Sequence, residues 1–165
     1  MSMLPELDLV GLADAIRDGS VSAEQATRAC LARLEGQGRA CNAVVMLDAD
    51  AALEAARAAD RARAHGAAPG PLHGVPLAHK DLFYRAGRVC AGGSKIRAGF
   101  VPDATATVLQ RLDRAGAIEL GTLHMAEFAL SPTGYNEHCG HGLNPWQPAH
   151  VCGGSSSGSG IAVAG

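Results

Sequence analysis

Residues 103–121, with the sequence DATATVLQRLDRAGAIELG, show the clearest alternation of secondary structure in the chain. Asp103 is suited to cap a helix over residues 104–115, and Gly116 is suited to end it. Residues 117–121 then have the apolar character of a strand. A strand that directly follows a helix is typical of a crossover unit, in which the helix packs against a sheet. This stretch therefore predicts an α/β fold.

The segments before this stretch continue the alternation. Helical spacing of apolar residues predicts helices from Leu9 to a turn at Gly19, from Ser22 to Gly36, and from Ala49 to His65. Ser22 and Gln25 have the spacing of a capping box, in which each side chain binds the backbone N–H of the other residue. Apolar runs predict a buried strand over residues 42–47 and a shorter strand over residues 75–79.

The pattern becomes less regular in the last third of the chain. Residues 125–130 predict one short helix, whereas residues 131–152 carry prolines, glycines and polar side chains with no sustained period. Long irregular segments of this kind often line functional sites. The apolar residues 161–165 begin a helix or strand that has no stop signal, so we expect the natural protein to continue beyond Gly165.

The composition is that of a globular protein built around aliphatic side chains. Of the 165 residues 47% are hydrophobic, aromatic residues are few, and the formal net charge is −2. Such a charge provides no basic surface for nucleic acid or anionic lipid, so we expect a small-molecule partner, with no membrane and no direct nucleic-acid binding. The five cysteines have no repeated spacing and fit a reducing compartment, and no signal peptide or transmembrane span is evident. The expected location is therefore the cytoplasm.

Two features carry the chemistry that the sequence suggests. Lys80 stands at the end of the apolar run GVPLAHK, and the stretch GGSSSGSG occupies residues 153–160. A free lysine has a pKa of about 10.4, so it acts as a base at neutral pH only where burial favours its uncharged amine. A hydroxyl both donates and accepts, so a serine can pass a proton between a nucleophile and such a lysine. The pattern predicts amide chemistry with Lys80 as base and Ser155 as proton relay.

Around these residues the chain contains a series of blocks that resembles, in the same order, the amidase signature family. The blocks are residues 12–34, residues 74–82, residues 116–128 and the sequence Asn-Pro-Trp at 144–146. The resemblance implies the amidase signature fold, a twisted mixed β-sheet flanked by helices, and hydrolysis of carbon–nitrogen amide bonds through an acyl-enzyme. It also implies a Ser-Ser-Lys triad in which Lys80 is the lysine and Ser155 is the middle serine, preceded by a cis peptide bond.

The acyl-forming serine of the family lies further along the chain than Gly165. We therefore expect residues 1–165 to be the N-terminal part of a single amidase domain, inactive and poorly folded when alone. The loop that begins at Ser131 falls in the substrate region of the family, which makes Ser131, Thr133 and Gly134 candidates for substrate binding. We expect neither a cofactor nor a metal. Three residues depart from those usual in the family: Thr122 from lysine, Cys152 from proline and Ser157 from glycine.

Other interpretations stay open at this point. Within the family, the chain also fits the glutaminase A subunit of a tRNA-dependent amidotransferase, which frees ammonia for partner subunits, and a homo-oligomer is a further alternative. A noncatalytic binding fragment that pairs with a complementary chain is the alternative of another class. His138, Cys139 and His141 have side chains that suit zinc, although their spacing is not that of a standard zinc finger. The remaining isolated histidines are expected to pack or to form hydrogen bonds; they are His73, His79 and His124.

Overall fold

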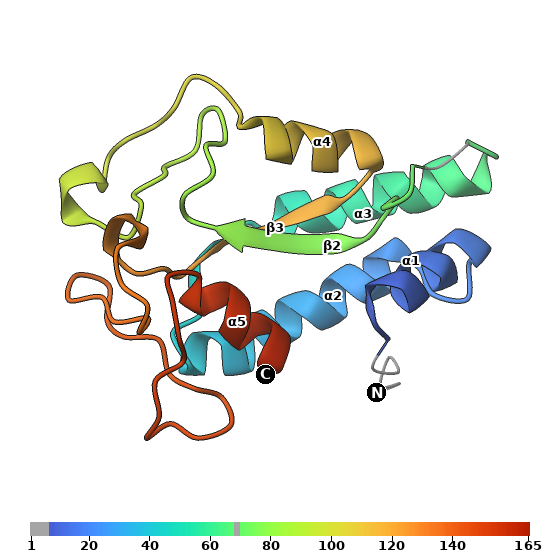
Figure 1. Ribbon diagram of the computed structural model, residues 1–165. Helices are drawn as coiled ribbons and strands as arrows, with labels where there is room; N and C mark the ends of the chain where they lie inside the picture. The colour runs from blue at the N-terminus through green and yellow to red at the C-terminus, as the bar shows by residue number, and fades with distance from the viewer. Residues whose placement is uncertain (1–6, 68–69) are drawn as a thin grey trace. The chain divides into compact units, whose positions relative to one another are not determined.

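The computed structural model describes residues 7–67 and 70–165 (Figure 1). Helices and strands alternate along these residues, which confirms the predicted α/β class. They are, in chain order, α1 (Leu9–Asp18), α2 (Ala23–Arg33), the π-helical turn η1 (Leu34–Gly38), β1 (Val44–Leu47), α3 (Ala49–Ala64), β2 (Pro76–Lys80), the 3-10 turn η2 (Lys95–Arg97), α4 (Thr107–Ala115), β3 (Ile118–Leu123), the 3-10 turn η3 (Glu127–Ala129) and α5 (Ser157–Ala164). Among the described residues, no helix has the length and apolar character required to cross a membrane.

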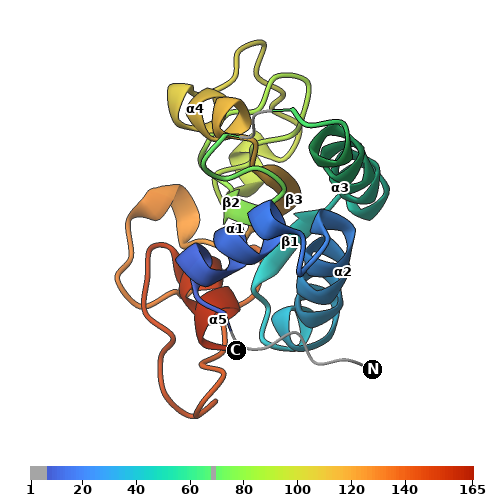
Figure 2. The same ribbon diagram turned by 90° about the vertical axis from the view of Figure 1, so that its right-hand side faces the viewer.

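The three strands form one sheet in the order β1-β3-β2 (Figures 1 and 2). β1 runs antiparallel to β3, with Val44 opposite Leu123 and Leu47 opposite Gly121. A side chain at position 121 would overlap the carbonyl oxygen of Met46, so the close approach of the two backbones requires glycine there.

The other strand pair determines where Lys80 lies. The Ile118 N–H donates to the Val75 carbonyl oxygen at 2.8 Å, and the Asp81 N–H donates to the Leu123 carbonyl oxygen at 3.0 Å. The residue numbers increase in the same direction on both strands, so β2 runs parallel to β3. The carboxyl ends of β2 and β3 therefore lie side by side, which places Lys80 next to the segment that leaves β3.

The described chain divides into two compact units. The first unit comprises residues 7–32, 48–67, 70–77 and 110–120, and the second comprises residues 33–47, 78–109 and 121–165. Lys80, Ser155 and the candidate substrate loop all belong to the second unit.

Helix ends in the first unit are fixed by capping. The Asp8 side chain accepts a hydrogen bond from the Gly11 N–H at 2.8 Å, and Gly19 ends α1 in the left-handed conformation, with φ 85°. The predicted capping box is confirmed: the Gln25 N–H binds Ser22 Oγ at 3.0 Å, and the Ser22 N–H binds Gln25 Oε1 at 2.9 Å. These bonds satisfy N–H groups that the first turn of a helix leaves unpaired.

The beginning of α5 is buried in the second unit. Ile161 of α5 is only 2% exposed, and α5 contacts the turn η1 (Figure 1). Ser157 and Gly158, which open the helix, are buried as well. The chain is therefore anchored in the interior of this unit from the second residue after Ser155 onward.

One helix starts later than the sequence predicts. The helix expected over residues 104–115 begins at Thr107, as α4. In the residues before it, Thr105 Oγ1 accepts a hydrogen bond from the Ala86 N–H at 3.1 Å. This bond to a distant segment takes the place of the helical turn that Asp103 was expected to cap.

The short helix predicted over residues 125–130 is reduced to the single 3-10 turn η3. Phe128 and Ala129 have positive φ values of 46° and 61°, which interrupt a regular helix. The Phe128 N–H donates to the Gly92 carbonyl oxygen at 2.9 Å, so a contact outside the segment stabilises this conformation.

Two smaller boundaries also differ from the prediction. The strand expected over residues 42–47 begins two residues later, because Asn42 is in a turn with φ 54°. It is half-buried and not fully buried, since Val45 is 45% exposed. The helix expected to end at Gly36 continues through a π-helical turn to Gly38.

Candidate active site

Lys80 is the last residue of β2, and its side chain meets that of Ser155. Lys80 Nζ donates a hydrogen bond to Ser155 Oγ at 2.7 Å. Lys80 is 8% exposed, and burial lowers the pKa of its amine from the ordinary value. A lowered pKa increases the fraction of uncharged amine, which is the form that accepts a proton. The structure thus brings together the two residues that the sequence singled out as base and relay.

Ser155 is constrained through its backbone. The Gly154–Ser155 peptide bond is cis, as the family resemblance implied, and the Ser155 carbonyl oxygen accepts a hydrogen bond from the Ala126 N–H at 3.1 Å. Gly154 has no room for a side chain, because a Cβ there would lie 2.6 Å from the Ser131 carbonyl oxygen and 2.7 Å from the Gly134 nitrogen. The glycine before the serine is therefore required for the turn to pack against the loop that begins at Ser131.

The three residues predicted to bind substrate form that neighbouring loop. Ser131 Oγ and Thr133 Oγ1 are hydrogen-bonded at 2.8 Å, and Gly134 is buried with a φ of 80°. A side chain on Gly134 would overlap the Gly153 carbonyl oxygen. Ser131 and Gly134 thus contact the glycine-rich turn with their backbones, whereas the two hydroxyls bind each other. Their role in substrate binding stays a prediction.

The carboxylate next to Lys80 in sequence is buried and organises the loop after β2. Asp81 is 3% exposed, and burial raises the pKa of its carboxyl. Hydrogen bonds from the backbone N–H groups of Gly93, Ala91 and Gly92 act in the opposite direction and lower it. Asp81 therefore holds this short glycine-rich stretch in place with its side chain.

The side chains that were considered for zinc have other partners. His138 Nε2 lies 2.9 Å from Glu127 Oε1, and His141 Nδ1 accepts a hydrogen bond from the Asn136 N–H at 3.0 Å. Cys139 is a free thiol. In the part of the chain that the structure describes, no group of three or more His, Cys, Asp and Glu side chains is placed to hold a metal ion.

Asn136 organises the same region, although sequence reasoning did not single it out. It is 2% exposed, and its Nδ2 donates to the carbonyl oxygens of Gly93 and Met125 at 2.8 and 2.9 Å. Its Oδ1 accepts from the N–H groups of His138 and Cys139 at 2.9 and 3.0 Å. The carbonyl oxygens of Gly93 and Met125 come from distant segments, so the local sequence did not reveal that Asn136 joins them.

His124, predicted only to pack or to hydrogen-bond, makes a bond on each side of its ring. Nδ1 lies 2.7 Å from Ser157 Oγ, and Nε2 lies 2.8 Å from the Gly140 carbonyl oxygen. The residue is 1% exposed, and burial lowers the pKa of its imidazole. Ser157 is two positions after Ser155, so His124 is bonded to the turn that carries Ser155.

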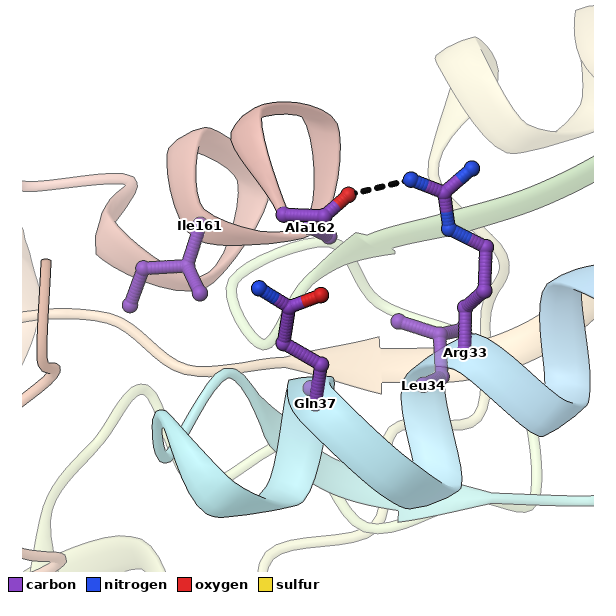
Figure 3. Close-up of a pocket in the computed structure, with 7 residues that line it drawn as sticks. Arg33, Leu34, Gln37, Ile161 and Ala162 are labelled. Atoms are coloured by element: carbon purple, nitrogen blue, oxygen red, sulfur yellow. Dashed lines mark hydrogen bonds between the residues drawn. The ribbon is translucent and has the colours of Figure 1, made fainter. Parts of the chain in front are cut away.

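A small cavity in the second unit is lined by other residues (Figure 3). They are Arg33, Leu34, Gln37, Gly38, Ile161, Ala162 and Gly165. The Arg33 guanidinium donates a hydrogen bond to the Gly165 carbonyl oxygen. The cavity volume of about 20 Å³ is room for about one water molecule. The lining includes neither Lys80 nor Ser155, so this cavity is not the site of the predicted chemistry.

Comparison with known proteins identifies the family. Residues 25–165 match the family model described as Amidase. This chain belongs to the Amidase family. The match covers most of this chain and includes both Lys80 and Ser155, which confirms the resemblance found in the sequence blocks.

Individual relatives of this chain agree with that assignment. The glutamyl-tRNA(Gln) amidotransferase A subunit of Cupriavidus necator is 48% identical over 153 residues, which cover 93% of this chain and 30% of that protein. The protein of the same name from Chloroflexus aurantiacus is 43% identical over 164 residues, which cover 99% of this chain and 34% of that protein. The chain thus spans about a third of the length of the curated relatives it matches.

Solved structures confirm the predicted amidase fold. The native peptide amidase from Stenotrophomonas maltophilia matches this chain with a TM-score of 0.87 at 35% sequence identity. The match covers 97% of this chain and 34% of that one. This chain therefore has the fold of the corresponding portion of that longer protein.

Proposed function

We propose that this chain supplies the base and the proton relay of an enzyme that hydrolyses carbon–nitrogen bonds in small-molecule amides. The observation that carries the proposal is the 2.7 Å hydrogen bond between Lys80 Nζ and Ser155 Oγ. Lysines at strand ends are mostly solvated, whereas only 8% of Lys80 is exposed. Membership of the Amidase family supports the same assignment.

In the proposed reaction, a serine that follows Gly165 in the complete polypeptide attacks the carbonyl carbon of the amide. Its proton passes to Ser155 Oγ while the Ser155 proton passes to the uncharged Lys80 amine. The proton returns along the same path to the departing nitrogen, and the carbon–nitrogen bond breaks to release ammonia or an amine and leave an acyl-enzyme. Water then attacks the acyl carbon, gives up its proton to Lys80 through Ser155, and releases the acid as the serine regains a proton.

We further propose that residues 1–165 are the N-terminal part of a single amidase domain that works in the cytoplasm. The chain covers 30% of the length of its relative from Cupriavidus necator, which supports the assignment to one part of a longer domain. Ser131, Thr133 and Gly134 are proposed to line the substrate side of the site, because their loop contacts the glycine that precedes Ser155.

The glutaminase A subunit of a tRNA-dependent amidotransferase is the second candidate function. The relatives from Cupriavidus necator and Chloroflexus aurantiacus, at 48% and 43% identity, carry the name of such a subunit. The proton path through Ser155 to Lys80 would be the same, with glutamine as the amide and with the ammonia passed to partner subunits. The two candidates differ in substrate, so an assay can separate them.

A chimera tests the chemistry directly. Residues 1–165 replace the matching segment of the Stenotrophomonas maltophilia peptide amidase, so that the rest of that enzyme completes the site. We expect the chimera to hydrolyse peptide amides, and we expect Lys80→Ala and Ser155→Ala to lower kcat by about a thousandfold. Lys95→Ala changes an exposed lysine of the same unit and should leave kcat unchanged. A fully active Lys80→Ala chimera would remove Lys80 from the proposed mechanism.

The natural full-length polypeptide decides between the two candidate functions. Ammonia release is measured with glutamine and with a panel of other carboxamides, in the presence and absence of amidotransferase partner subunits. Preference for glutamine together with stimulation by the partner subunits would select the glutaminase, and hydrolysis of other amides without them would select the amidase. A folded polypeptide that hydrolyses none of these substrates would favour the noncatalytic binding role.

A further inference from the structure

We propose that His124 is a positioning residue for the Lys80–Ser155 pair and that it acts through Ser157. The inference rests on the proposed function, because it assigns His124 a task in the same proton relay. Both ring nitrogens of His124 are occupied, one by Ser157 Oγ and the other by the Gly140 carbonyl oxygen. The imidazole therefore holds the turn that carries Ser155 and does not itself transfer the proton.

The partners of the His124 ring determine where its hydrogen lies. A carbonyl oxygen can only accept, so the 2.8 Å contact with Gly140 requires the hydrogen on Nε2. The ring is 1% exposed, and burial lowers its pKa, which favours the neutral form in which Nδ1 is an acceptor. The Ser157 hydroxyl must then donate to Nδ1 across 2.7 Å. The bond therefore has a defined direction, from the serine to the ring.

The residues that leave β3 bind the turn around Ser155 at three points. The bonds run from the Ala126 N–H to the Ser155 carbonyl oxygen (3.1 Å), from Ser157 Oγ to His124 Nδ1 (2.7 Å), and from the Gly158 N–H to the His124 carbonyl oxygen (2.8 Å). Only the middle bond is made by two side chains. It is therefore the one whose contribution can be removed by substitution without changing the backbone.

The same residues also determine the position of Lys80. The Asp81 N–H donates to the Leu123 carbonyl oxygen at 3.0 Å, which extends the pairing of β2 with β3 one residue beyond Lys80. Leu123 is followed directly by His124. Lys80 and Ser155 are thus both placed against one short segment, and a shift of the turn relative to that segment changes the distance between Nζ and Oγ.

The packing at this point leaves little free space. A Cβ on Gly158 would lie 2.5 Å from the Ala43 carbonyl oxygen and would overlap the His124 nitrogen. Ser157 itself is 1% exposed. The turn cannot move closer to His124, so loss of the Ser157 bond allows it to move only away from the segment that also positions Lys80. Misplacing a reacting group by about 1 Å lowers rates by up to about a hundredfold, so even a partial shift is measurable in kcat.

The test uses Ser157→Ala and His124→Gln in the natural full-length polypeptide. We expect each substitution to lower kcat for amide hydrolysis by about tenfold while KM changes by less than about twofold, because the relay and not the substrate is displaced. The matched control is His73→Gln, which changes a histidine of the first unit whose Nε2 contacts the Ala59 carbonyl oxygen at 3.0 Å. This control should leave kcat unchanged, even if it lowers thermal stability.

The double variant shows whether His124 and Ser157 act on kcat through their shared hydrogen bond or independently of each other. If His124 acts through Ser157, the variant that carries both substitutions should have the kcat of His124→Gln alone. Multiplied losses in the double variant would overturn the proposed coupling. Should His124→Gln fail to fold, Ser157→Ala still decides the matter, since it removes one hydroxyl and leaves a good helix former at that position.

A measurement that does not depend on activity completes the test. Nitrogen-15 NMR of the histidine rings should show that His124 carries its hydrogen on Nε2 and accepts a hydrogen bond at Nδ1. In Ser157→Ala the signal of the hydrogen bond at Nδ1 should disappear. The opposite tautomer would overturn the inference. Wild-type activity combined with full activity of Ser157→Ala and His124→Gln would overturn this inference alone, whereas an inactive wild type would overturn the proposed function and this inference with it.

Discussion

The side chains of Lys80 and Ser155 are joined by a hydrogen bond of 2.7 Å, although the two residues are 75 positions apart in the chain. Lys80 depends on the end of β2 for its position, and Ser155 depends on the turn that precedes α5. Both residues belong to the second compact unit. The hydrogen bond therefore lies within one unit. Its contribution to catalysis is measured by enzyme kinetics, and its contribution to stability is measured by unfolding.

Lys80→Met should separate the catalytic contribution of the Lys80 amine from the contribution that the side chain makes to stability by packing. We expect kcat for amide hydrolysis by the natural full-length polypeptide to fall by about a thousandfold, because the proton from Ser155 then has no acceptor. The free energy of unfolding at pH 7 should not fall, since methionine avoids the desolvation that disfavours a buried charged amine. Steady-state kinetics and urea unfolding measure the two effects. A kcat within about twofold of wild type would contradict the proposed role of Lys80.

The pH dependence of activity should follow the lowered pKa of Lys80. Burial lowers this pKa below 10.5, so kcat/KM should rise with pH and reach half of its maximum below that value. Stability should change in the same direction: between the folded pKa and 10.5 the unfolded chain binds the proton that the folded chain has released, so the free energy of unfolding rises with pH. A pH–rate profile checks the activity, and urea unfolding at several pH values checks the stability. A midpoint of the pH–rate profile at or above pH 10.5 would be inconsistent with a buried base.

Two glycines of α5 should respond in opposite ways to the same substitution. Gly158→Ala places a Cβ 2.5 Å from the Ala43 carbonyl oxygen and should lower the free energy of unfolding by about 1–3 kcal/mol. Gly160→Ala meets no atom within 4 Å and should raise it by about 0.5–1 kcal/mol, because alanine favours the helix. Urea unfolding of both variants makes the comparison. Equal effects would mean that the start of α5 is not packed as tightly as described.

The capping box of α2 offers a prediction for the first unit. Ser22→Ala should lower the free energy of unfolding by about 1 kcal/mol, because the Gln25 N–H loses its partner at 3.0 Å. Ser20→Ala is the control: Ser20 is exposed, and its hydroxyl makes solvent-accessible contacts with the Ala15 carbonyl oxygen, at 3.3 Å, and with the Asp18 carboxylate. We expect a change of less than about 0.5 kcal/mol for the control, measured by the same unfolding experiment.

The parts of the fold that the sequence predicted are those whose signals are local. The bonds between Ser22 and Gln25 lie within one helical turn, so their spacing alone was sufficient. The turn at Phe128 was predicted wrongly because its backbone N–H binds the Gly92 carbonyl oxygen, a partner that no local pattern reveals. The late start of α4 has the same cause, since Thr105 binds the Ala86 N–H from a distant segment.

The candidate site divides in a similar way. Lys80 and Ser155 could be named from their motifs, and the structure supplies the distance between them. The tasks of Asn136 and His124 could not be named, because a buried amide or imidazole is defined by the carbonyl and hydroxyl groups that surround it. The partners of His124 are the Ser157 hydroxyl and the Gly140 carbonyl oxygen, and folding alone brings these two groups to the imidazole.

The buried amide of Asn136 also has a consequence for the chemical degradation of this protein during storage. Both of its hydrogens are donated to carbonyl oxygens, those of Gly93 and Met125. Spontaneous deamidation would turn the donating nitrogen into an oxygen, and acceptors would then face each other at both contacts without a hydrogen between them. Chains that acquire this lesion should unfold more readily than intact ones, and mass spectrometry of stored samples would find them concentrated in the insoluble fraction.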